Sequence, residues 1–353
     1  MGGVPNPRKA AVFDKYQVHK EGTQYEKCCA WRTAVGLQAV DGLSVSRYLE
    51  ETACRHIEGD ISIDEANELI NEYYAVLGEA DEDAARVQEA DTVAARIAAI
   101  LSEKATSFTP VTLRKIHERL FDGLYDHAGM WRRCVITKRE WVLGGESVSY
   151  THPFMIEDTL DYDFKQERDF SYRGLPLQEI IRHVAKFISG IWQIHPFREG
   201  NTRTTAVFCI QYLRKLGLEI DNEPFAANSW YFRNALVRAN YSDVKNGIFE
   251  TREFLDMFFD NLLLHGNHVL SNRSMLVKPD MPNRHDGGLA LSADEKSLLA
   301  YLGANPVMRQ SELASAMGKS GRTIQRMTVA LQKKGLLTRE NGRRNGRWVV
   351  KMV

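Results

Sequence analysis

The strongest constraint on the fold is a long apolar segment, LQEIIRHVAKFISGIWQI, at residues 177–194. A helix that is apolar around most of its circumference must be surrounded by other elements. Apolar residues recur at helical spacing in most of the remaining chain, which therefore supplies helices to surround it. The further helical segments lie at residues 43–59, 62–77, 81–104, 111–125, 201–216, 229–239 and 251–264. The sequence thus predicts a mostly α fold with 177–194 as a buried central helix.

One segment has a different pattern. Residues 134–150, CVITKREWVLGGESVSY, place β-branched and aromatic residues on both sides of a Gly-Gly pair. This arrangement predicts a β-hairpin with its turn at the two glycines.

The composition is that of an ordinary soluble protein. Apolar residues make up 44% and charged residues 26% of the 353 residues, which excludes a fibrous or wholly disordered chain. No apolar run approaches the roughly 20 residues that a membrane helix needs, and the first residues lack an apolar signal core. The five cysteines are odd in number and lack metal-ligand spacing. We therefore expect a cytoplasmic protein with no membrane partner.

The net charge is zero, but basic and acidic residues are unevenly distributed along the chain. Residues 291–353 contain 12 Lys or Arg and 4 Asp or Glu, whereas residues 1–290 contain 34 and 42. A basic tail on an acidic body indicates a separate module with a polyanionic partner. Residues 273–290 carry two prolines and a Gly-Gly, which is typical of a linker. We expect an N-terminal helical region at 1–107, a core at 108–272, this linker and a C-terminal domain.

The sharpest motif is HPFREGNTR, from His195 to Arg203, between two helical segments. Gly200 permits a tight turn and a close approach of the backbone to a ligand. Asn201, Thr202 and Arg203 then begin a helix, where free N–H groups and the helix dipole favour phosphate. The guanidinium of Arg203 adds a charged fork for phosphate oxygens.

Two more residues of the motif carry chemistry. Glu199 is a hard oxygen ligand suited to Mg²⁺ that bridges two phosphates, and His195 can take a hydroxyl proton near neutral pH. Any one of these residues alone fits a plain helix–loop–helix corner with surface charge. The complete run favours a nucleotide-phosphate site with a metal carboxylate and a general base.

The run resembles the signature of Fic proteins, His-x-Phe-x-Asp/Glu-Gly-Asn-Gly-Arg-x-x-Arg, and the similarity extends over about 108–272. It implies a helical Fic-type core and transfer of AMP from ATP to a protein hydroxyl. His195 would be the catalytic base and Glu199 would hold Mg²⁺. The phosphate-binding residues would be Gly200, Asn201, Thr202 and Arg203. The hairpin at 134–150 would be a flap that pairs with the target as an added strand, with a plain edge hairpin as the alternative.

The sequence departs from the signature at two positions. Thr202 replaces the second Gly of Gly-Asn-Gly, which adds a Cβ near the phosphate and a hydroxyl that can donate to it. Ala206 replaces the final Arg, which in the family contacts the distal phosphate. Arg233 or Arg238 could substitute in space, or both could be surface charges on an amphipathic helix. These departures leave the nucleotide preference open.

A second resemblance lies at Cys54 to Asp60, CRHIEGD. Many Fic proteins carry an inhibitory helix of pattern Ser/Thr-x-x-x-Glu-Gly/Asn, here with Cys54 in the first position. The resemblance implies that Glu58 blocks placement of the γ-phosphate. Because Ala206 cannot pair with it, Glu58 would need another cation such as Arg203. The alternative is a surface glutamate beside a helix-ending glycine.

The basic tail has the pattern of a winged helix-turn-helix domain: helix, helix, three-residue turn, helix and basic wing. Its expected core residues are Leu313, Met317, Ile324, Val329, Leu331 and Leu336. Its expected DNA-binding residues are Arg322, Gln325 and Arg326 on the recognition helix and Arg343, Arg344 and Arg347 on the wing. A winged helix used for protein contact or dimerisation is the alternative, and the basic charge favours DNA.

The sequence therefore predicts a Mg²⁺-dependent protein adenylyltransferase that uses ATP, is autoinhibited by an N-terminal helix and carries a DNA-binding module. Its partners would be a protein target or this chain itself, DNA through 291–353, and a second copy of the chain in a homodimer. The rival is a catalytically weak nucleotide-binding Fic protein that acts as a transcriptional regulator. Thr202 and Ala206 favour the rival, whereas His195 favours the enzyme.

Overall fold

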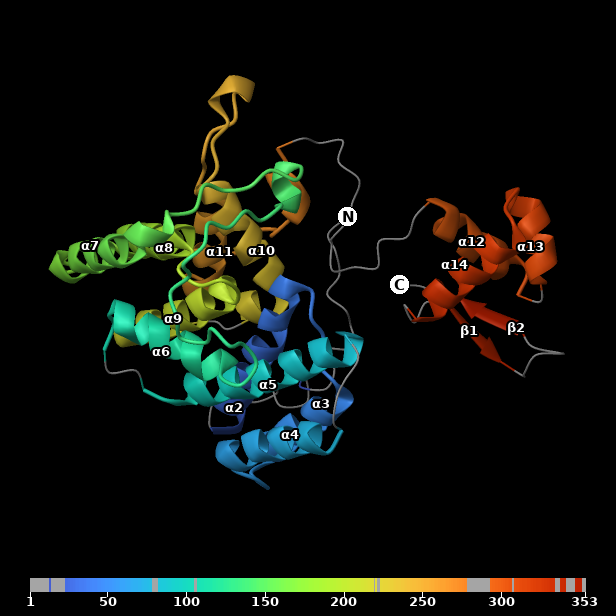
Figure 1. Ribbon diagram of the computed structural model, residues 1–353, viewed down its shortest axis with the longest axis horizontal. Coiled ribbons are helices and arrows are strands. Elements are labelled where there is room, and N and C mark those ends of the chain that lie inside the picture. Colours follow the sequence, from blue (N-terminus) through green and yellow to red (C-terminus); the bar gives the residue numbers. More distant parts are fainter. Residues whose placement is uncertain are drawn as a thin grey trace. The chain divides into compact units, whose positions relative to one another are not determined.

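The computed structural model describes residues 13, 23–77, 82–104, 107–218, 220, 223–277, 293–306, 308–333, 337–340 and 347–350 (Figure 1). The chain divides into two compact units, residues 1–282 and 283–353. The first unit thus contains the N-terminal helices as well as the segment with the motif.

The N-terminal part of the first unit is helical and its helix ends follow local rules. Its elements are α2 (Thr23–Leu37), η1 (Gln38–Asp41), α3 (Arg47–Glu58), α4 (Ile63–Leu77) and α5 (Glu82–Ser102). Ser46 caps α3 by accepting from the Leu49 amide at 3.1 Å, and Gly59 closes it with a φ of 92°. Ser62 and Glu65 exchange capping-box bonds of 2.6 and 3.1 Å, as their spacing predicts.

The rest of the first unit supplies the helices around the motif. Its helices are α6 (Pro110–Phe121), α7 (Ile156–Asp169), α8 (Leu177–Ile194), α9 (Asn201–Lys215), α10 (Glu223–Ala239) and α11 (Glu253–Leu263). Its short 3₁₀ turns are η2 (Trp141–Leu143), η3 (Pro153–Met155), η4 (Val244–Asn246) and η5 (Asn272–Met275). Thr109 caps α6 and Pro110 occupies its first turn, where proline is favoured.

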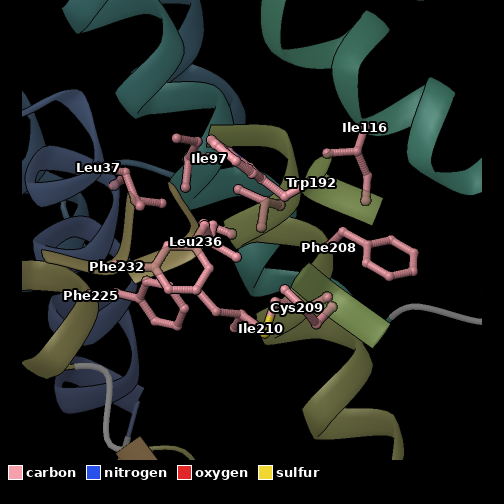
Figure 2. Packing of buried hydrophobic residues seen from close by; sticks show 14 of the residues in the cluster. Leu37, Ile97, Ile116, Trp192, Phe208, Cys209, Ile210, Phe225, Phe232 and Leu236 are labelled. Carbon is pink, nitrogen blue, oxygen red and sulfur yellow. The ribbon is translucent and has the colours of Figure 1, made fainter. Parts of the chain in front are cut away.

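The central helix is α9, not the apolar segment 177–194. Every residue of α9 from Asn201 to Leu213 is buried, whereas α8 buries one face and exposes Glu179, Arg182 and Lys186. The prediction was wrong because several polar residues of α9, among them Thr202, Arg203 and Gln211, are buried with hydrogen-bond partners, and polar residues weaken the apolar signal of this segment. Figure 2 shows side chains from several helices converging on this region. They include Leu37 of α2, Ile97 of α5, Ile116 of α6, Trp192 of α8, Phe208 of α9 and Phe232 of α10.

Residues 131–152 form the flap loop, which contains no β-strand. Its tip is the 3₁₀ turn η2 followed by Gly144 and Gly145, both with positive φ. The Glu140 amide donates to Glu146 O at 2.9 Å across the tip. The backbone hydrogen bonds of a β-ladder do not continue from this pair along the described flap loop. The predicted β-hairpin is therefore absent as strands, and the flap has two extended arms joined by a turn. Tertiary contacts, including the Val277 amide to Val142 O at 3.0 Å, hold the tip.

The second unit contains α12 (Ala293–Ala304), α13 (Gln310–Met317), α14 (Gly321–Lys333), β1 (Leu337–Glu340) and β2 (Arg347–Val350). The strands are antiparallel, with Leu337 opposite Val350 and Glu340 opposite Arg347. Its buried core includes Leu298, Leu302, Leu313, Ile324, Leu331, Leu337 and Trp348. Met317 is half-buried against this core, Val329 is 46% exposed and is not a core residue, and Leu336 lies outside the described residues.

Within the described ranges, we find no helix that combines the length and the apolar character needed to cross a membrane.

Candidate active site at the junction of α8 and α9

The motif forms the tight turn between α8 and α9. His195 follows α8 with a φ of 51°, and Gly200 precedes α9 with a φ of 74°. Left-handed backbone is natural for glycine but uncommon for histidine, and such strain is concentrated at functional sites. The Asn201 side chain closes the turn by accepting from Phe197 N–H at 2.9 Å and donating to Phe197 O at 2.8 Å. Asn201 therefore shapes the loop through its side chain.

His195 has the tautomer that a general base needs. Its Nδ1 lies 3.1 Å from Trp192 O, and because a carbonyl only accepts, Nδ1 carries the proton and Nε2 keeps its lone pair. Nε2 is buried without a hydrogen-bond partner among the described residues. Burial, followed by the nearby charges of Lys138, Arg233 and Arg132, holds the pKa of His195 well below its usual value. The imidazole is therefore neutral at pH 7.

The flap loop covers His195. The Tyr150 ring lies on the imidazole of His195 with centroids 4.1 Å apart and planes tilted by 32°. His195 is only 2% exposed. Another molecule can reach Nε2 of His195 only after the side chains that cover it move.

Arg132 fixes the backbone around His195. Its Nε donates to His195 O at 2.7 Å, its Nη1 to Cys134 O at 2.8 Å and its Nη2 to Thr151 O. The Arg132 amide also donates to Pro196 O at 2.8 Å. One buried guanidinium thus ties both arms of the flap loop to the motif. Its hydrogen-bond partners in the described chain are carbonyl oxygens, so no carboxylate neutralises it.

Glu199, the expected metal ligand, pairs with a cation of the flap loop. Lys138 Nζ lies 2.7 Å from Glu199 Oε2, and the two side chains are 25% and 53% exposed. Mg²⁺ is commonly held by one or two carboxylates together with substrate phosphates. No cluster of three His, Cys, Asp or Glu residues suited to a metal occurs in the described part of the chain. The site therefore fits Mg²⁺ that arrives with a nucleotide, provided that Lys138 leaves Glu199.

The N-terminus of α9 offers backbone donors. Thr204 N–H donates to Gly200 O at 3.0 Å, so the three amides before it have no acceptor within the helix. No side chain caps this end, which suits it to an anion. The Thr202 hydroxyl accepts from Trp192 Nε1 at 3.0 Å, so the residue that departs from the signature is anchored to α8.

Arg203 is paired inside the fold. The guanidinium is almost fully buried, with Nε 2.8 Å from Asp41 Oδ2 and Nη2 2.6 Å from Glu89 Oε1. It also donates to Gln38 at 3.2 Å and to the Tyr125 hydroxyl at 3.2 Å. The expected use of Arg203 for phosphate therefore requires that it leave two carboxylates. In this structure it joins α9 to η1 and α5.

The residues considered as substitutes for the missing Arg have other positions. Ala206 is completely buried in the apolar core, so this place does not accommodate an arginine. Arg233 forms a two-pronged ion pair with buried Glu140 of the flap loop, at 2.6 and 3.0 Å. Arg238 is 9% exposed and donates to Phe249 O at 3.5 Å. Neither arginine is a plain surface charge, and Arg233 braces the flap near His195.

Glu58 does not meet Arg203 in this structure. It is exposed at the last position of α3, and the carboxylates on Arg203 are those of Asp41 and Glu89. The expected Glu58–Arg203 pair is therefore not formed. The physical reason is that the buried guanidinium already has two acidic partners.

His117 supports the motif, although sequence reasoning missed it. Its Nδ1 accepts from the Gly129 amide at 2.9 Å, so its Nε2 carries the proton and donates to Glu199 O at 3.0 Å. Its ring stacks on Phe197 with centroids 3.8 Å apart. Burial lowers the pKa of His117 to about 3. Lys138, Tyr150, Glu140, Asp41 and Glu89 were missed too, because nothing in local spacing marks residues that meet only across the fold.

In the second unit, the structure describes some of the expected DNA-binding residues. Gln325 and Arg326 are exposed on α14 and Arg347 is exposed on β2. Arg322 lies on α14, and its side chain is outside the described parts. Arg343 and Arg344 lie outside the described residues.

Residues 107–213, which contain α6, the flap loop, the motif and most of α9, match the family model described as Fic/DOC family. This segment is therefore similar to the Fic/DOC family. The chain is similar to the "Protein adenylyltransferase VbhT" of Bartonella schoenbuchensis, with 32% identity over 110 residues, which are 31% of this chain and 22% of that protein. It is also similar to the "Probable protein adenylyltransferase y4lH" of Sinorhizobium fredii, with 29% identity over 134 residues, 37% of this chain and 65% of that protein.

The matched segments thus span about a fifth and about two thirds of those relatives. Among solved structures, a Fic family protein from Desulfovibrio desulfuricans G20 aligns with 98% of this chain and 94% of its own, at 14% identity and a TM-score of 0.44.

Proposed function

We propose that residues 107–213 form a Fic-type domain that transfers AMP from ATP to a hydroxyl group of a protein target, or of this chain itself. The observation that carries the proposal is the neutral His195 imidazole, with its unpartnered Nε2, at a turn that leads into the uncapped N-terminus of α9. The names of the two relatives, both adenylyltransferases, support the same activity.

In this reaction the target hydroxyl oxygen attacks the α-phosphorus of ATP. The bond from that phosphorus to the oxygen bridging the β-phosphate breaks, and pyrophosphate leaves. The hydroxyl proton passes to Nε2 of His195, and the same proton leaves to solvent when the product departs. Because burial and nearby cations disfavour imidazolium, His195 returns readily to its neutral form. General base catalysis of this kind contributes roughly 10²–10⁴ in rate.

The other residues of the turn would bind and neutralise phosphates. The amides of Gly200, Asn201 and Thr202 would line the anion hole at the start of α9. Glu199 would hold Mg²⁺, which supplies charge neutralisation on the α- and β-phosphates. Arg203 would add charge to this site when its pairs with Asp41 and Glu89 loosen.

The purified full chain with α-labelled ATP and Mg²⁺ tests the proposal. His195→Ala should abolish transfer of label to protein and leave binding of a non-hydrolysable ATP analogue largely intact. His268→Ala, a half-exposed histidine paired with Asp260, is the matched control and should transfer label normally. Undiminished transfer by His195→Ala would exclude His195 as the base. Nucleotide binding without transfer in the wild-type chain would favour the rival, a nucleotide-binding regulator.

We further propose that Glu58 restrains the site, as its sequence pattern implies. Since Arg203 is held by other carboxylates, Glu58 would act by repelling the γ-phosphate when α3 approaches the nucleotide. Glu58→Gly should then tighten ATP binding and raise transfer, whereas Glu51→Gly, on the same helix and paired with Arg47, should change neither. If Glu58→Gly matches the wild type in both measurements, α3 is ordinary structure.

The second unit supports a second function, DNA binding through a winged helix. The supporting observation is the order α12, α13, α14 and then an antiparallel pair of strands, with Gln325, Arg326 and Arg347 exposed. A protein that neutralises Z phosphates of duplex DNA shows a slope near −0.9Z when the logarithm of its binding constant is plotted against the logarithm of salt concentration. Replacing Arg343, Arg344 and Arg347 by Ala in the full chain should make this slope shallower. Absence of DNA binding even at low salt would assign the unit to protein contact or dimerisation.

A further inference from the structure

A cavity of about 370 Å³ lies beside the motif, on the first arm of the flap loop. Its lining includes Met130, Trp131, Arg132 and Arg133 from the flap side and Arg198 from the motif itself. Glu199 and the anion-binding positions 200–203 are not part of the lining. The cavity is therefore adjacent to the proposed phosphate site and distinct from it.

The cavity is positively charged. It has three arginines in its lining against one acidic residue, Asp126. Arg133 and Arg198 are exposed, and neither has a hydrogen-bond or ion-pair partner within the described ranges. The third arginine, Arg132, is buried and bound by carbonyl oxygens, so its charge adds to the field in the cavity. This local charge stands in a stretch of chain, residues 1–290, that is acidic as a whole.

The cavity is also close to the reacting atoms. Arg132 Nε donates to His195 O at 2.7 Å, and Arg198 lies between His195 and Glu199 in the motif. Trp131 contacts Phe197 of the motif, with ring centroids 5.0 Å apart. A side chain a few residues from the modified hydroxyl of a bound target can therefore reach this cavity.

We propose that this cavity binds an acidic side chain, Asp or Glu, of the protein target near the hydroxyl that receives AMP. The inference rests on the proposed transferase function and names the specificity of that site. The forks of Arg133 and Arg198 match a carboxylate. Apolar surface in the same lining, on Met130 at 49% exposure, fits the aliphatic stem of a glutamate. The cavity volume lies at the small end of the roughly 300–1,000 Å³ range of ligand sites.

The rival occupant is a phosphate of the nucleotide. Two observations favour the target over the nucleotide. The open amides of α9 and the proposed metal ligand are outside the lining, and the cavity follows residues 131–134 of the flap loop, the arm along which we expect a target segment to lie. The test therefore measures peptide and nucleotide binding separately.

Three labelled peptides of equal length serve as probes, each with a central serine flanked by glutamates, by glutamines or by lysines. Binding to the full chain is measured by fluorescence anisotropy, without nucleotide and with a non-hydrolysable ATP analogue. The variants are Arg133→Gln with Arg198→Gln, and the charge swap Arg133→Glu with Arg198→Glu. Arg214→Gln, on α9 and bound to Leu101 O, is a control outside the cavity.

The glutamate peptide should bind the wild type at least tenfold more tightly than the glutamine peptide, and the advantage should fall several-fold in the double Gln variant. The double Glu variant should prefer the lysine peptide. Affinity for the ATP analogue should stay within twofold throughout. If transfer is measurable, the Gln variant should raise KM for the glutamate peptide with little change in kcat.

Two results would overturn the proposal. Equal affinity of the wild type for the glutamate and glutamine peptides means that the cavity does not select acidic targets. A large loss of ATP-analogue affinity in the double Gln variant assigns the arginines to the nucleotide. The binding measurements do not depend on AMP transfer. A chain that binds the glutamate peptide selectively but transfers no AMP would therefore contradict the proposed function and still support acidic-side-chain binding in this cavity.

Discussion

The ring of Tyr150 lies on the imidazole of His195, with centroids 4.1 Å apart, and shields the imidazole from solvent. Desolvation is the largest cause of the lowered pKa of His195. The flap loop therefore lowers the proton affinity of His195 through packing.

Tyr150→Ala should raise the pKa of His195 toward its usual value, because the imidazole gains solvent. An NMR titration of His195 measures the pKa shift. The pH at which the rate of AMP transfer falls on the acid side of its pH profile should rise with this pKa. The stability cost should be no more than about 3 kcal/mol, because the side chain is only partly buried. Tyr150→Phe keeps the ring and should titrate as the wild type. An unchanged pKa in Tyr150→Ala would mean that other groups desolvate the base.

Gly200→Ala should destabilise the protein by about 2–4 kcal/mol. The new Cβ would lie 2.3 Å from Cε2 of Phe121, at a φ of 74°, so it adds overlap to backbone strain. Gly217→Ala has a similar φ of 78° with no atom within 4 Å of its Cβ, and should cost only about 1 kcal/mol. Urea unfolding of both variants gives the difference. Equal costs would show that Phe121 moves aside freely.

Lys138→Met should lower the Mg²⁺ concentration needed for half-maximal binding of an ATP analogue. The ammonium group competes with the metal for Glu199 at 2.7 Å. A pair this exposed is worth at most about 1 kcal/mol, which limits the change to roughly fivefold.

Glu199→Ala should weaken Mg²⁺-dependent binding specifically. If ATP affinity with Mg²⁺ is the same in Glu199→Ala and wild type, Glu199 is a surface residue outside the metal site.

Glu89→Gln should destabilise the protein more than Asp41→Asn. Both carboxylates pair with the buried guanidinium of Arg203, and their side chains are 21% and 35% exposed. Removing one partner from a buried charge costs about 3–5 kcal/mol, less here because solvent reaches both acids. Thermal unfolding of the two variants shows which substitution destabilises the protein more.

The same variants should bind the ATP analogue more tightly if Arg203 contacts phosphate. Unchanged binding would limit Arg203 to a structural role.

Acid should destabilise the fold through its buried histidines. The pKa of His117 is lowered to about 3 and that of His56 to about 4, in both cases mainly by burial. Between pH 6.5 and those values the unfolded chain binds protons that the folded chain does not. Stability therefore falls as pH drops below about 6.5, by about 1.4 kcal/mol per pH unit for each such site.

His117→Gln tests this contribution, because an amide can accept from Gly129 and donate to Glu199 O without titrating. The free energy of unfolding, measured in urea at pH 7 and pH 5, should depend less steeply on pH in this variant. The same pH dependence in variant and wild type would show that His117 is protonated in the folded protein.

Sequence patterns located the helices and the motif because both depend on local rules. The capping pair Ser62 and Glu65 is three residues apart and forms as predicted. The motif at 195–203 lies between two helices as its apolar flanks indicate. The β-hairpin at 134–150 was predicted on equally local grounds and is absent as strands, because tertiary contacts hold the flap loop. Strand propensity depends on partners that the sequence does not name.

The sequence by itself determined a mostly helical protein with a Fic-like motif at 195–203 and a basic C-terminal segment. Only the tertiary structure decided the partners of those residues. Arg203 meets Asp41 and Glu89, Glu199 meets Lys138, and Tyr150 covers His195. These pairs join segments that are far apart in the chain. Burial and charge act through space, so the pairings exist only once the helices have packed.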